Sequence, residues 1–338
     1  MSFITMNESA MFYECGFSCD NGILFKNDEH IYFITDSRYT LEAKERTKHR
    51  KNIEIIDSDD LVKSLFLVAK DEKDIVFDPF DLNLESYNKI SSKLNLKAEI
   101  SFHKKLRMIK SEDEINIIKK SQKLNKKAFK KFAKYLSRNN IDGRDEYYLN
   151  FKARQFLEHK GKYSLSFSPI VALNKNAAKP HAQATKDRFK KGDLILFDAG
   201  IKYNRYCSDM TRSAYYDGEI RFSKSQKFPK QIQKIYDIVL KAQKNAINKA
   251  RSGMMAKEID HIARDIILKA GYGDYFTHST GHGIGLDIHE FPIISRKSDT
   301  IIEDGMVFSI EPGIYIPNDF GIRIEDLVVM KNGRAEIL

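Results

Sequence analysis

The chain has 338 residues, 42% hydrophobic and 31% charged, with 17 glycines and 7 prolines, which excludes a disordered, collagen-like or low-complexity protein. At ~150 residues per domain, this length predicts two domains. No stretch approaches the ~18 apolar residues of a membrane-spanning helix, and residues 1–16 lack the basic and apolar regions of a secretory signal. The lack of such an apolar stretch leads us to expect no membrane partner. Cys15 and Cys19 are too widely spaced for a redox Cys-x-x-Cys, so the three cysteines favour a reduced, cytoplasmic compartment.

Short strand-like and helical runs alternate over the first hundred residues, as in a small α/β domain. Two apolar runs, 22–25 and 30–35, are joined by a polar turn and predict neighbouring strands. We expect this domain to span residues 1–105 and to end within the segment 102–109. The further elements expected in it are a helix over 36–46, a strand over 52–56, a helix over 60–70 and a strand over 74–77.

The net charge of +10, from 57 basic and 47 acidic residues, raises the question of a nucleic-acid partner. The lysines are spread along the chain and are locally dense only over residues 104–134. Most of that stretch has apolar residues at helical spacing, and Ser111 with Glu114 forms a capping box at its start. We therefore interpret the lysines as the solvated face of an amphipathic helix and expect no nucleic-acid binding.

From residue 106 onward, long helices are followed by pairs of short strands, without an internal repeat. This order predicts an α+β domain over residues 106–338. Its helices are expected over about 112–138, 145–159, 228–251 and 255–270.

Two aspartates stand on strand-like runs that a short turn could join. Asp198 ends an apolar run, and Asp209 lies in a second run a few residues later. A hairpin turning at Tyr203 and Asn204 would place the two carboxylates directly opposite each other, with Cβ atoms ~4.5–5.5 Å apart. Like charges so placed repel, so the pattern predicts a shared proton or a cation between them.

The same pattern recurs near the end of the sequence. Glu311 ends an extended run that Pro312 stops, and Glu325 belongs to a later strand-like run. A hairpin centred on Asn318 would pair these two glutamates. Two hairpins that each present an opposed pair of carboxylates therefore indicate a metal site.

A glycine-rich segment between the two hairpins adds a histidine. Glycines flank His282 and leave room for the close approach of backbone or ligand. Four carboxylates and one imidazole suit two bridged divalent ions, such as Mn, Co, Zn or Fe, better than a single structural zinc. Such ions, ~3.5–4 Å apart, would bind a bridging water and lower its pKa towards neutrality, making hydroxide available as the nucleophile.

Seven segments of the chain carry a resemblance to a known family. They are Gly16–Phe17, Thr35–Tyr39, Phe197–Gly200, Ser208–Arg212, Gly281–Glu290, Ile310–Gly313 and Gly321–Asp326. The last five, in this order, resemble the pita-bread metallopeptidases, which include aminopeptidase P, prolidase and methionine aminopeptidase. The first two are similar to the creatinase-type domain of the proline-specific members. The resemblance covers nearly the whole chain and implies an α/β creatinase-type domain followed by an α+β pita-bread catalytic domain.

The resemblance also implies the metal ligands and their roles. Asp209 and Glu325 would bridge two divalent ions. Asp198 would chelate one ion, and His282 with Glu311 would complete the other. Manganese is the first candidate for the metal, with cobalt, zinc and iron as alternatives.

Further residues match family positions around the metals. His181 would contact the substrate, and His289 would hydrogen-bond the scissile carbonyl or the developing oxyanion. Arg323 and Thr211 would orient the bridging carboxylates. For His278, a place in the wall of the active site and a purely structural role stand equally open.

The implied activity is that of a dinuclear-metal exopeptidase that hydrolyses the amino-terminal Xaa-Pro bond of peptides, as a cytoplasmic homodimer. The alternatives are a non-catalytic pita-bread binding module and a metal-free creatinase-type hydrolase. Both typically lack part of the ligand set, and all five ligands are present here. Methionine aminopeptidase is disfavoured because a domain of ~100 residues precedes the catalytic one.

Within this activity, we expect an Xaa-Pro aminopeptidase rather than an Xaa-Pro dipeptidase (prolidase). A dipeptidase must bind the free carboxylate of its substrate, most naturally with an arginine. Dipeptidases of this family often place a basic residue shortly after the His-Glu pair, but Ile293 occupies that stretch here and the first arginine is Arg296. The dipeptidase stays the alternative, because Arg296, Arg323 or a basic residue from the amino-terminal domain of a partner subunit could bind the carboxylate.

Overall fold

A computed structural model describes residues 1–138 and 141–338 of the chain. They form two compact units, Met1–Arg107 and Met108–Leu338. None of the helices in these described ranges is both long enough and apolar enough to cross a membrane.

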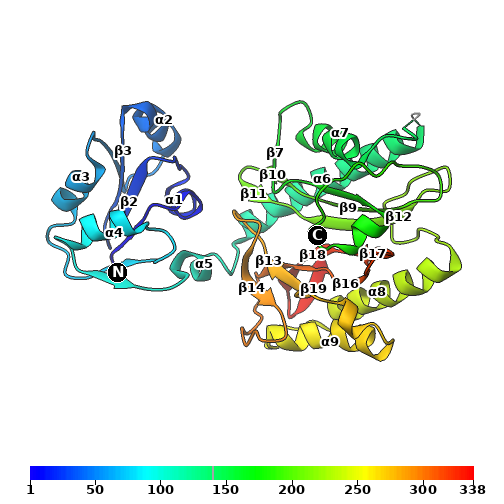
Figure 1. The fold of residues 1–338 in the computed structure, drawn as a ribbon. Helices are drawn as coiled ribbons and strands as arrows, with labels where there is room; N and C mark the ends of the chain where they lie inside the picture. The colour runs from blue at the N-terminus through cyan, green and yellow to red at the C-terminus, as the bar shows by residue number, and fades with distance from the viewer. Residues whose placement is uncertain (139–140) are drawn as a thin grey trace. The chain divides into compact units, whose positions relative to one another are not determined.

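The first unit is a six-stranded mixed sheet with helices (Figure 1). Its elements are β1 (Phe3–Thr5), α1 (Glu8–Cys15), β2 (Gly22–Lys26), β3 (Ile31–Thr35), α2 (Ser37–Thr47), β4 (Ile53–Asp57), α3 (Leu61–Val68), β5 (Ile75–Phe77), α4 (Leu84–Ser91), β6 (Leu96–Ala98) and α5 (Phe102–Leu106). The strand order is β4-β3-β2-β1-β5-β6. All the elements expected between residues 22 and 77 are confirmed, and β1, α1, α4, β6 and α5 are additional to them.

The sheet of the first unit is buried on both faces. Ile23 and Phe25 belong to one hydrophobic cluster, whereas Leu24, between them on β2, belongs to another. Successive residues of a strand point to opposite faces, so the two clusters lie on the two sides of the sheet. This explains the continuous apolar runs in the sequence.

The second unit contains the four long helices that the sequence predicts. They are α6 (Glu112–Arg138), α7 (Glu146–Glu158), α8 (Lys230–Lys249) and α9 (Ala256–Lys269), and two short 3₁₀ helices, η1 (Asn174–Ala178) and η2 (Gly273–Tyr275), accompany them. The capping box of α6 is confirmed: the Glu114 N–H donates to Ser111 Oγ (3.3 Å), and the Ser111 N–H donates to Glu114 Oε2 (2.8 Å).

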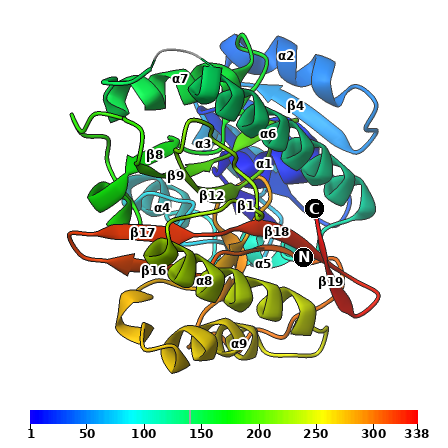
Figure 2. The same ribbon diagram turned by 90° about the vertical axis from the view of Figure 1, so that its right-hand side faces the viewer.

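The strands of the second unit lie between two pairs of helices. They are β7 (Ser164–Leu165), β8 (Ile170–Leu173), β9 (Leu194–Ala199), β10 (Ile201–Tyr203), β11 (Tyr206–Cys207), β12 (Met210–Tyr215), β13 (Gly281–Gly283), β14 (Glu290–Ile294), β15 (Val307–Ile310), β16 (Gly313–Ile316), β17 (Phe320–Arg323), β18 (Asp326–Lys331) and β19 (Arg334–Ile337). They form sheets β12-β9-β8, β11-β10-β7, β14-β13-β15-β18-β19 and β16-β17. Figures 1 and 2 show α6 and α7 on one side of these strands and α8 and α9 on the other.

The first predicted hairpin has a different register. Its turn lies at Asn204 and Arg205, both at positive φ (47° and 72°), as in the two-residue turn that matches the twist of a hairpin. Because this turn is one residue later than predicted, Asp198 lies opposite Thr211. The prediction that Asp198 and Asp209 stand directly opposite each other is therefore wrong.

The second predicted hairpin is confirmed. The β16–β17 and β15–β18 ladders share a single register centred on Asn318. Glu311 and Glu325 lie between the two ladders, where the strands pass from one sheet to the other. Their side chains are thus presented where the regular pairing is interrupted.

Candidate metal centre

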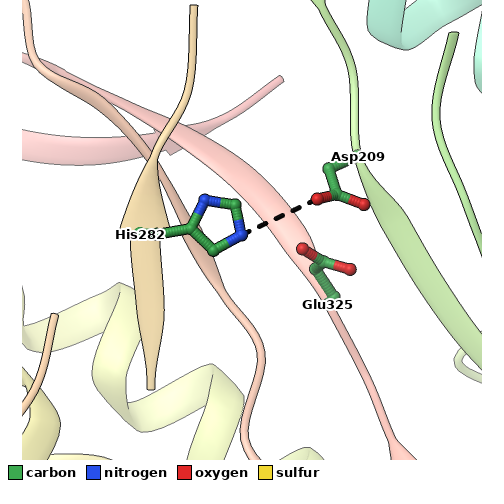
Figure 3. Close-up of side chains that lie close together, drawn as sticks. All are labelled: Asp209, His282 and Glu325. Carbon is green, nitrogen blue, oxygen red and sulfur yellow. Dashed lines mark ion pairs between the residues drawn. The ribbon is translucent and has the colours of Figure 1, made fainter. Parts of the chain in front are cut away.

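Three of the five predicted ligands converge on one point of the second unit (Figure 3). Ligand atoms of Asp209, His282 and Glu325 all lie within 4.8 Å of one another. His282 Nε2 is 3.8 Å from Asp209 Oδ2 and 3.4 Å from Glu311 Oε1, so the fourth predicted ligand lies beside them. The fifth predicted ligand, Asp198, forms an ion pair with Arg323.

The backbone around His282 fixes the orientation of its ring. Nδ1 lies 3.0 Å from the carbonyl of Gly283, and since a carbonyl only accepts, the proton is on Nδ1. Burial lowers the pKa of His282, which favours the neutral ring. The Nε2 lone pair then faces carboxylate oxygens, an arrangement that repels unless a proton or a cation lies between them.

Glycine at position 281 allows the strands that carry the site to approach closely. A Cβ on Gly281 would lie 1.9 Å from the carbonyl oxygen of Ser309. The hydroxyl of Ser309 in turn accepts from the His282 N–H (3.0 Å) and donates to Glu311 Oε1 (3.0 Å). The expectation that these glycines permit close backbone approach is confirmed.

Unpaired carboxylate oxygens indicate what the centre can hold. Within the described part of the chain, Asp198 Oδ1, Asp209 Oδ1 and Glu325 Oε1 are buried without a hydrogen-bond partner. Buried polar atoms are normally paired, and a divalent cation would satisfy several such oxygens together. The donor set therefore fits divalent metal ions.

Three carboxylates of the centre, those of Asp209, Glu325 and Glu311, have raised pKa values. Burial, followed by the neighbouring Glu325 and Asp198 charges, raises the pKa of Asp209 well above its usual range. Burial, followed by the Glu311 and Asp198 charges, does the same to the pKa of Glu325. Burial is also the main cause that raises the pKa of Glu311 to about 7. A bound cation would reverse this balance, because it favours the ionised carboxylates.

Arg323 and Thr211 hold two of these carboxylates in place. Arg323 Nη2 donates to Asp198 Oδ2 (2.6 Å), and Arg323 Nε donates to the hydroxyl of Thr211 (3.0 Å). The Thr211 hydroxyl donates to Glu325 Oε2 (2.7 Å), which leaves Glu325 Oε1 facing the centre. These contacts suit the orienting role that the resemblance implies.

His278 belongs to the same hydrogen-bond chain. Arg323 Nη1 donates to the hydroxyl of Tyr315 (2.8 Å), which in turn contacts His278 Nε2 (2.8 Å). His278 Nδ1 donates to the carbonyl of Ser279 (2.7 Å), so Nε2 accepts the Tyr315 proton. Burial lowers the pKa of His278 to about 3, which keeps the ring neutral.

The two predicted catalytic histidines are exposed. The rings of His289 and His282 are edge-to-face with centroids 4.4 Å apart, so His289 adjoins the centre. His181 lies on the loop after η1, and the preceding residue, Pro180, accepts a hydrogen bond from Arg323 Nη1 (3.2 Å). The loop that carries His181 is thus attached to the network around the carboxylates.

Three residues that support the centre are not among the predicted site residues: Tyr315, Ser309 and Gln122. Gln122 Nε2 donates to the backbone carbonyl of Asp209 (2.8 Å). The sequence gives a weak indication of this role, since Gln122 and Asn125 are polar residues within the apolar stripe of α6. Both are fully buried in the structure. Ser309 gives a similar indication, as a buried polar residue within the apolar run of β15, whereas Tyr315 gives none.

Comparison with known proteins identifies the family. Residues 116–332 match metallopeptidase family M24. The chain belongs to this family. The Xaa-Pro dipeptidase of Pyrococcus furiosus is 40% identical over 256 residues, which cover 75% of this chain and 70% of that protein.

Solved structures of the family extend the likeness to the whole chain. An Xaa-Pro dipeptidase from Bacillus anthracis matches with a TM-score of 0.89 at 31% identity, over 99% of this chain and 92% of that one. An X-Pro aminopeptidase from Thermotoga maritima matches with a TM-score of 0.87 at 30% identity, over 99% and 94%. The expected fold, a creatinase-type α/β domain followed by a pita-bread α+β domain, is confirmed, and the chain is a metallopeptidase.

Proposed function

We propose that this metallopeptidase is an Xaa-Pro aminopeptidase that holds two divalent ions at the centre described above. The observation that carries the metal assignment is the set of buried, unpaired oxygens of Asp198, Asp209 and Glu325 around the His282 lone pair. In this proposal Asp209 and Glu325 bridge the two ions. Asp198 binds one ion, and His282 and Glu311 bind the other.

The side chains around the centre have distinct tasks in the proposed reaction. Two bound divalent ions supply Lewis-acid activation of a water nucleophile. His289, beside His282, donates a hydrogen bond to the scissile carbonyl as negative charge develops on its oxygen. His181 contacts the substrate, while Thr211 and Arg323 keep Glu325 and Asp198 in orientation.

The proposed substrate class is peptides with proline in the second position. The names of the relatives support it, since those with a stated substrate are Xaa-Pro peptidases of both kinds, dipeptidases and an aminopeptidase. We propose manganese as the metal and a homodimer in the cytoplasm. A metal titration and analytical ultracentrifugation would test the first two of these.

The choice of an aminopeptidase depends on Ile293. In the β13–β14 ladder, Ile293 lies directly opposite His282, and cross-strand partners point to the same face of a sheet. Ile293 is apolar and 43% exposed, so this position beside the centre has no charge to bind a substrate carboxylate. Arg296 lies beyond the end of β14.

Peptide length tests this choice directly. Without a carboxylate-binding charge at position 293, we expect Xaa-Pro-Yaa peptides to be cleaved at least ~10-fold better than Xaa-Pro dipeptides, or ~1.4 kcal/mol of transition-state stabilisation. The measurement is kcat/KM for Ala-Pro and Ala-Pro-Ala after reconstitution with Mn, Co or Zn. Faster hydrolysis of the dipeptide would decide for the alternative, an Xaa-Pro dipeptidase, which the named relatives also support.

A pair of variants isolates the position. Ile293→Arg should shift the preference towards the dipeptide, because the added guanidinium can pair with its carboxylate. Ile301→Arg is the matched control, since Ile301 is equally exposed (44%) and pairs with Met255. An equal shift in both variants would show that net charge, rather than position 293, sets the preference.

A further inference from the structure

A buried ion pair joins the start of the second unit to the strand that follows His289. Lys110 Nζ lies 3.0 Å from Glu290 Oε2, and the two side chains are 1% and 0% exposed. Charges removed from water in this way are costly unless each is paired and hydrogen-bonded. Neither residue is among the predicted ligands or substrate contacts, so the pair has no task in the function proposed above.

The Glu290 carboxylate contacts the segment that carries His289. Its second oxygen, Oε1, accepts a hydrogen bond from the N–H of Asp287 (3.1 Å). A Cβ on Gly285 would lie 2.5 Å from Glu290 Oε2, so a larger residue at position 285 would force this paired carboxylate or the segment 284–289 to shift. The segment therefore packs against the Glu290 carboxylate, whose position is fixed by Lys110.

Lys110 is itself anchored to the sheet. Its N–H donates to the carbonyl of Gly305 (2.9 Å), and the preceding Ile109 forms a bridge with Met306, directly before β15. The other side of the segment is held by the Cys207 N–H, which donates to the carbonyl of Gly285 (2.8 Å). The segment 284–289 is thus tied to residues 305 and 306 through the Lys110–Glu290 pair and to β11 through Cys207. Its first residue, Ile284, also donates its N–H to the carbonyl of Val307 in β15 (3.2 Å).

We propose that Lys110 and Glu290 are positioning residues that fix the segment 284–289 and so hold the His289 ring against His282. The effect on turnover rests on the proposed function, whereas the effect on the His289 ring does not. Loss of the pair would leave the ligands in place, because none of them lies in this segment. It would loosen His289, whose ring packs against that of His282.

Three variants test the proposal: Lys110→Met, Glu290→Gln and the double variant. Each should lower kcat by about tenfold to a hundredfold, because small misplacements of a reacting group cost rate on this scale. The affinity for Mn²⁺, measured by calorimetry, should stay within about twofold of wild type. The double variant removes both buried charges, so it should be more thermally stable than either single variant, which leaves one charge unpaired. Its kcat should stay low, because the two neutral side chains no longer form the ion pair that fixes the segment.

Two further measurements separate positioning from structural support. In a His289→Ala background, Lys110→Met should change kcat by less than about twofold, because the residue through which it acts is already gone. In metal-free protein with labelled histidine, the His289 NMR signal should shift or broaden in Lys110→Met and not in Lys89→Met, which breaks the exposed Lys89–Glu85 pair.

Opposite results would overturn the proposal. An equal loss of kcat with and without His289, or a kcat restored together with stability in the double variant, would show a merely structural ion pair. An unchanged His289 signal in Lys110→Met would also contradict it. Should wild type not cleave Xaa-Pro peptides, the proposed function fails, and the NMR comparison still decides whether the pair positions His289.

Discussion

Asp209 and Glu325 each bury a carboxylate oxygen that has no hydrogen-bond partner among the described residues. If both bridge two ions, then Asp209→Ala or Glu325→Ala should abolish turnover and metal binding together. Metal analysis beside the activity assay checks this. The control is Asp319→Ala, an exposed acid in the β16–β17 turn. Two full metal equivalents retained in either variant would remove the bridging assignment.

The raised pKa of Glu311 makes a prediction about metal-free protein. Burial is the main cause that raises this pKa from 4.5 to about 7, so the folded state binds more protons than the unfolded state between these values. The free energy of unfolding should therefore fall as pH rises from about 4.5 to 7, by roughly 3 kcal/mol for one group. Urea unfolding with chelator at pH 5 and pH 7.5 measures it.

The control for the pH prediction is a variant that lacks the Glu311 carboxyl. Glu311→Gln should show a smaller fall in stability over this range, and saturating Mn²⁺ should counteract the fall in wild type. Stability that rises between pH 5 and 7.5 in the presence of chelator would contradict the assignment of burial as the dominant cause.

His289 adjoins the centre without being a predicted ligand. His289→Ala should leave metal content near wild type and lower kcat by ~10²–10³, the usual loss when one oxyanion donor is removed. Metal analysis and kcat for an Xaa-Pro-Yaa peptide check this. Loss of bound metal, or an unchanged rate, would mean that the residue has a different role.

At the level of elements, β12 and β18 are joined by a buried ion pair behind the centre. Arg212 Nη2 donates to Asp326 Oδ1 (2.6 Å), and Gln243 Nε2 donates to Asp326 Oδ2 (2.8 Å). Burial alone would raise the pKa of Asp326, but Arg212 and Lys224 together lower it to about 2. The ionised carboxylate thus stabilises the contact between the two strands.

Asp326→Asn should destabilise the protein by about 3–5 kcal/mol, because it leaves the charge of Arg212 buried without its partner. The depressed pKa means that this stabilisation is complete above about pH 4 and is lost as pH falls towards 2. Acid unfolding of the variant should therefore depend less on pH in that window. Asp319→Asn is the exposed control, and an identical acid response in wild type and Asp326→Asn would contradict the prediction.

Helices and hairpins differ in how well the sequence predicts them. The four long helices and the Ser111–Glu114 cap follow from local periodicity and capping chemistry. The hairpin centred on Asn318 follows from Pro312, which ends the first strand, and from a symmetrical spacing. For the other hairpin, the sequence predicts a turn one residue too early, because nothing in the sequence indicates the positive φ of Arg205.

The supporting contacts of the site follow less readily from sequence. Residues far apart in the chain create them, such as Tyr315 with His278, or Gln122 with Asp209. A buried polar residue in an apolar stripe shows that it needs a partner, but only the packed fold shows which partner it has. Five ordered motifs, in contrast, suffice to predict the family and the set of candidate ligands.

For the whole molecule, the family and the fold are established, and the central proposal is metal-dependent hydrolysis of Xaa-Pro peptides. The net charge of +10 is compatible with a peptide substrate. Most of the lysine-rich stretch 104–134 lies in α6, where the lysines alternate with buried apolar residues. These lysines therefore form the solvated face of an amphipathic helix and do not require a nucleic-acid partner. All five predicted ligands lie in the second unit, residues Met108–Leu338.

The most direct test is the hydrolysis of Ala-Pro-Ala by wild-type protein as a function of bound Mn²⁺. The proposal predicts that alanine and Pro-Ala are released, that the rate is lost with chelator and returns on reconstitution, and that Asp209→Ala stays inactive throughout. Absence of cleavage with two equivalents of metal bound, or equal cleavage after the metal is removed, would contradict it.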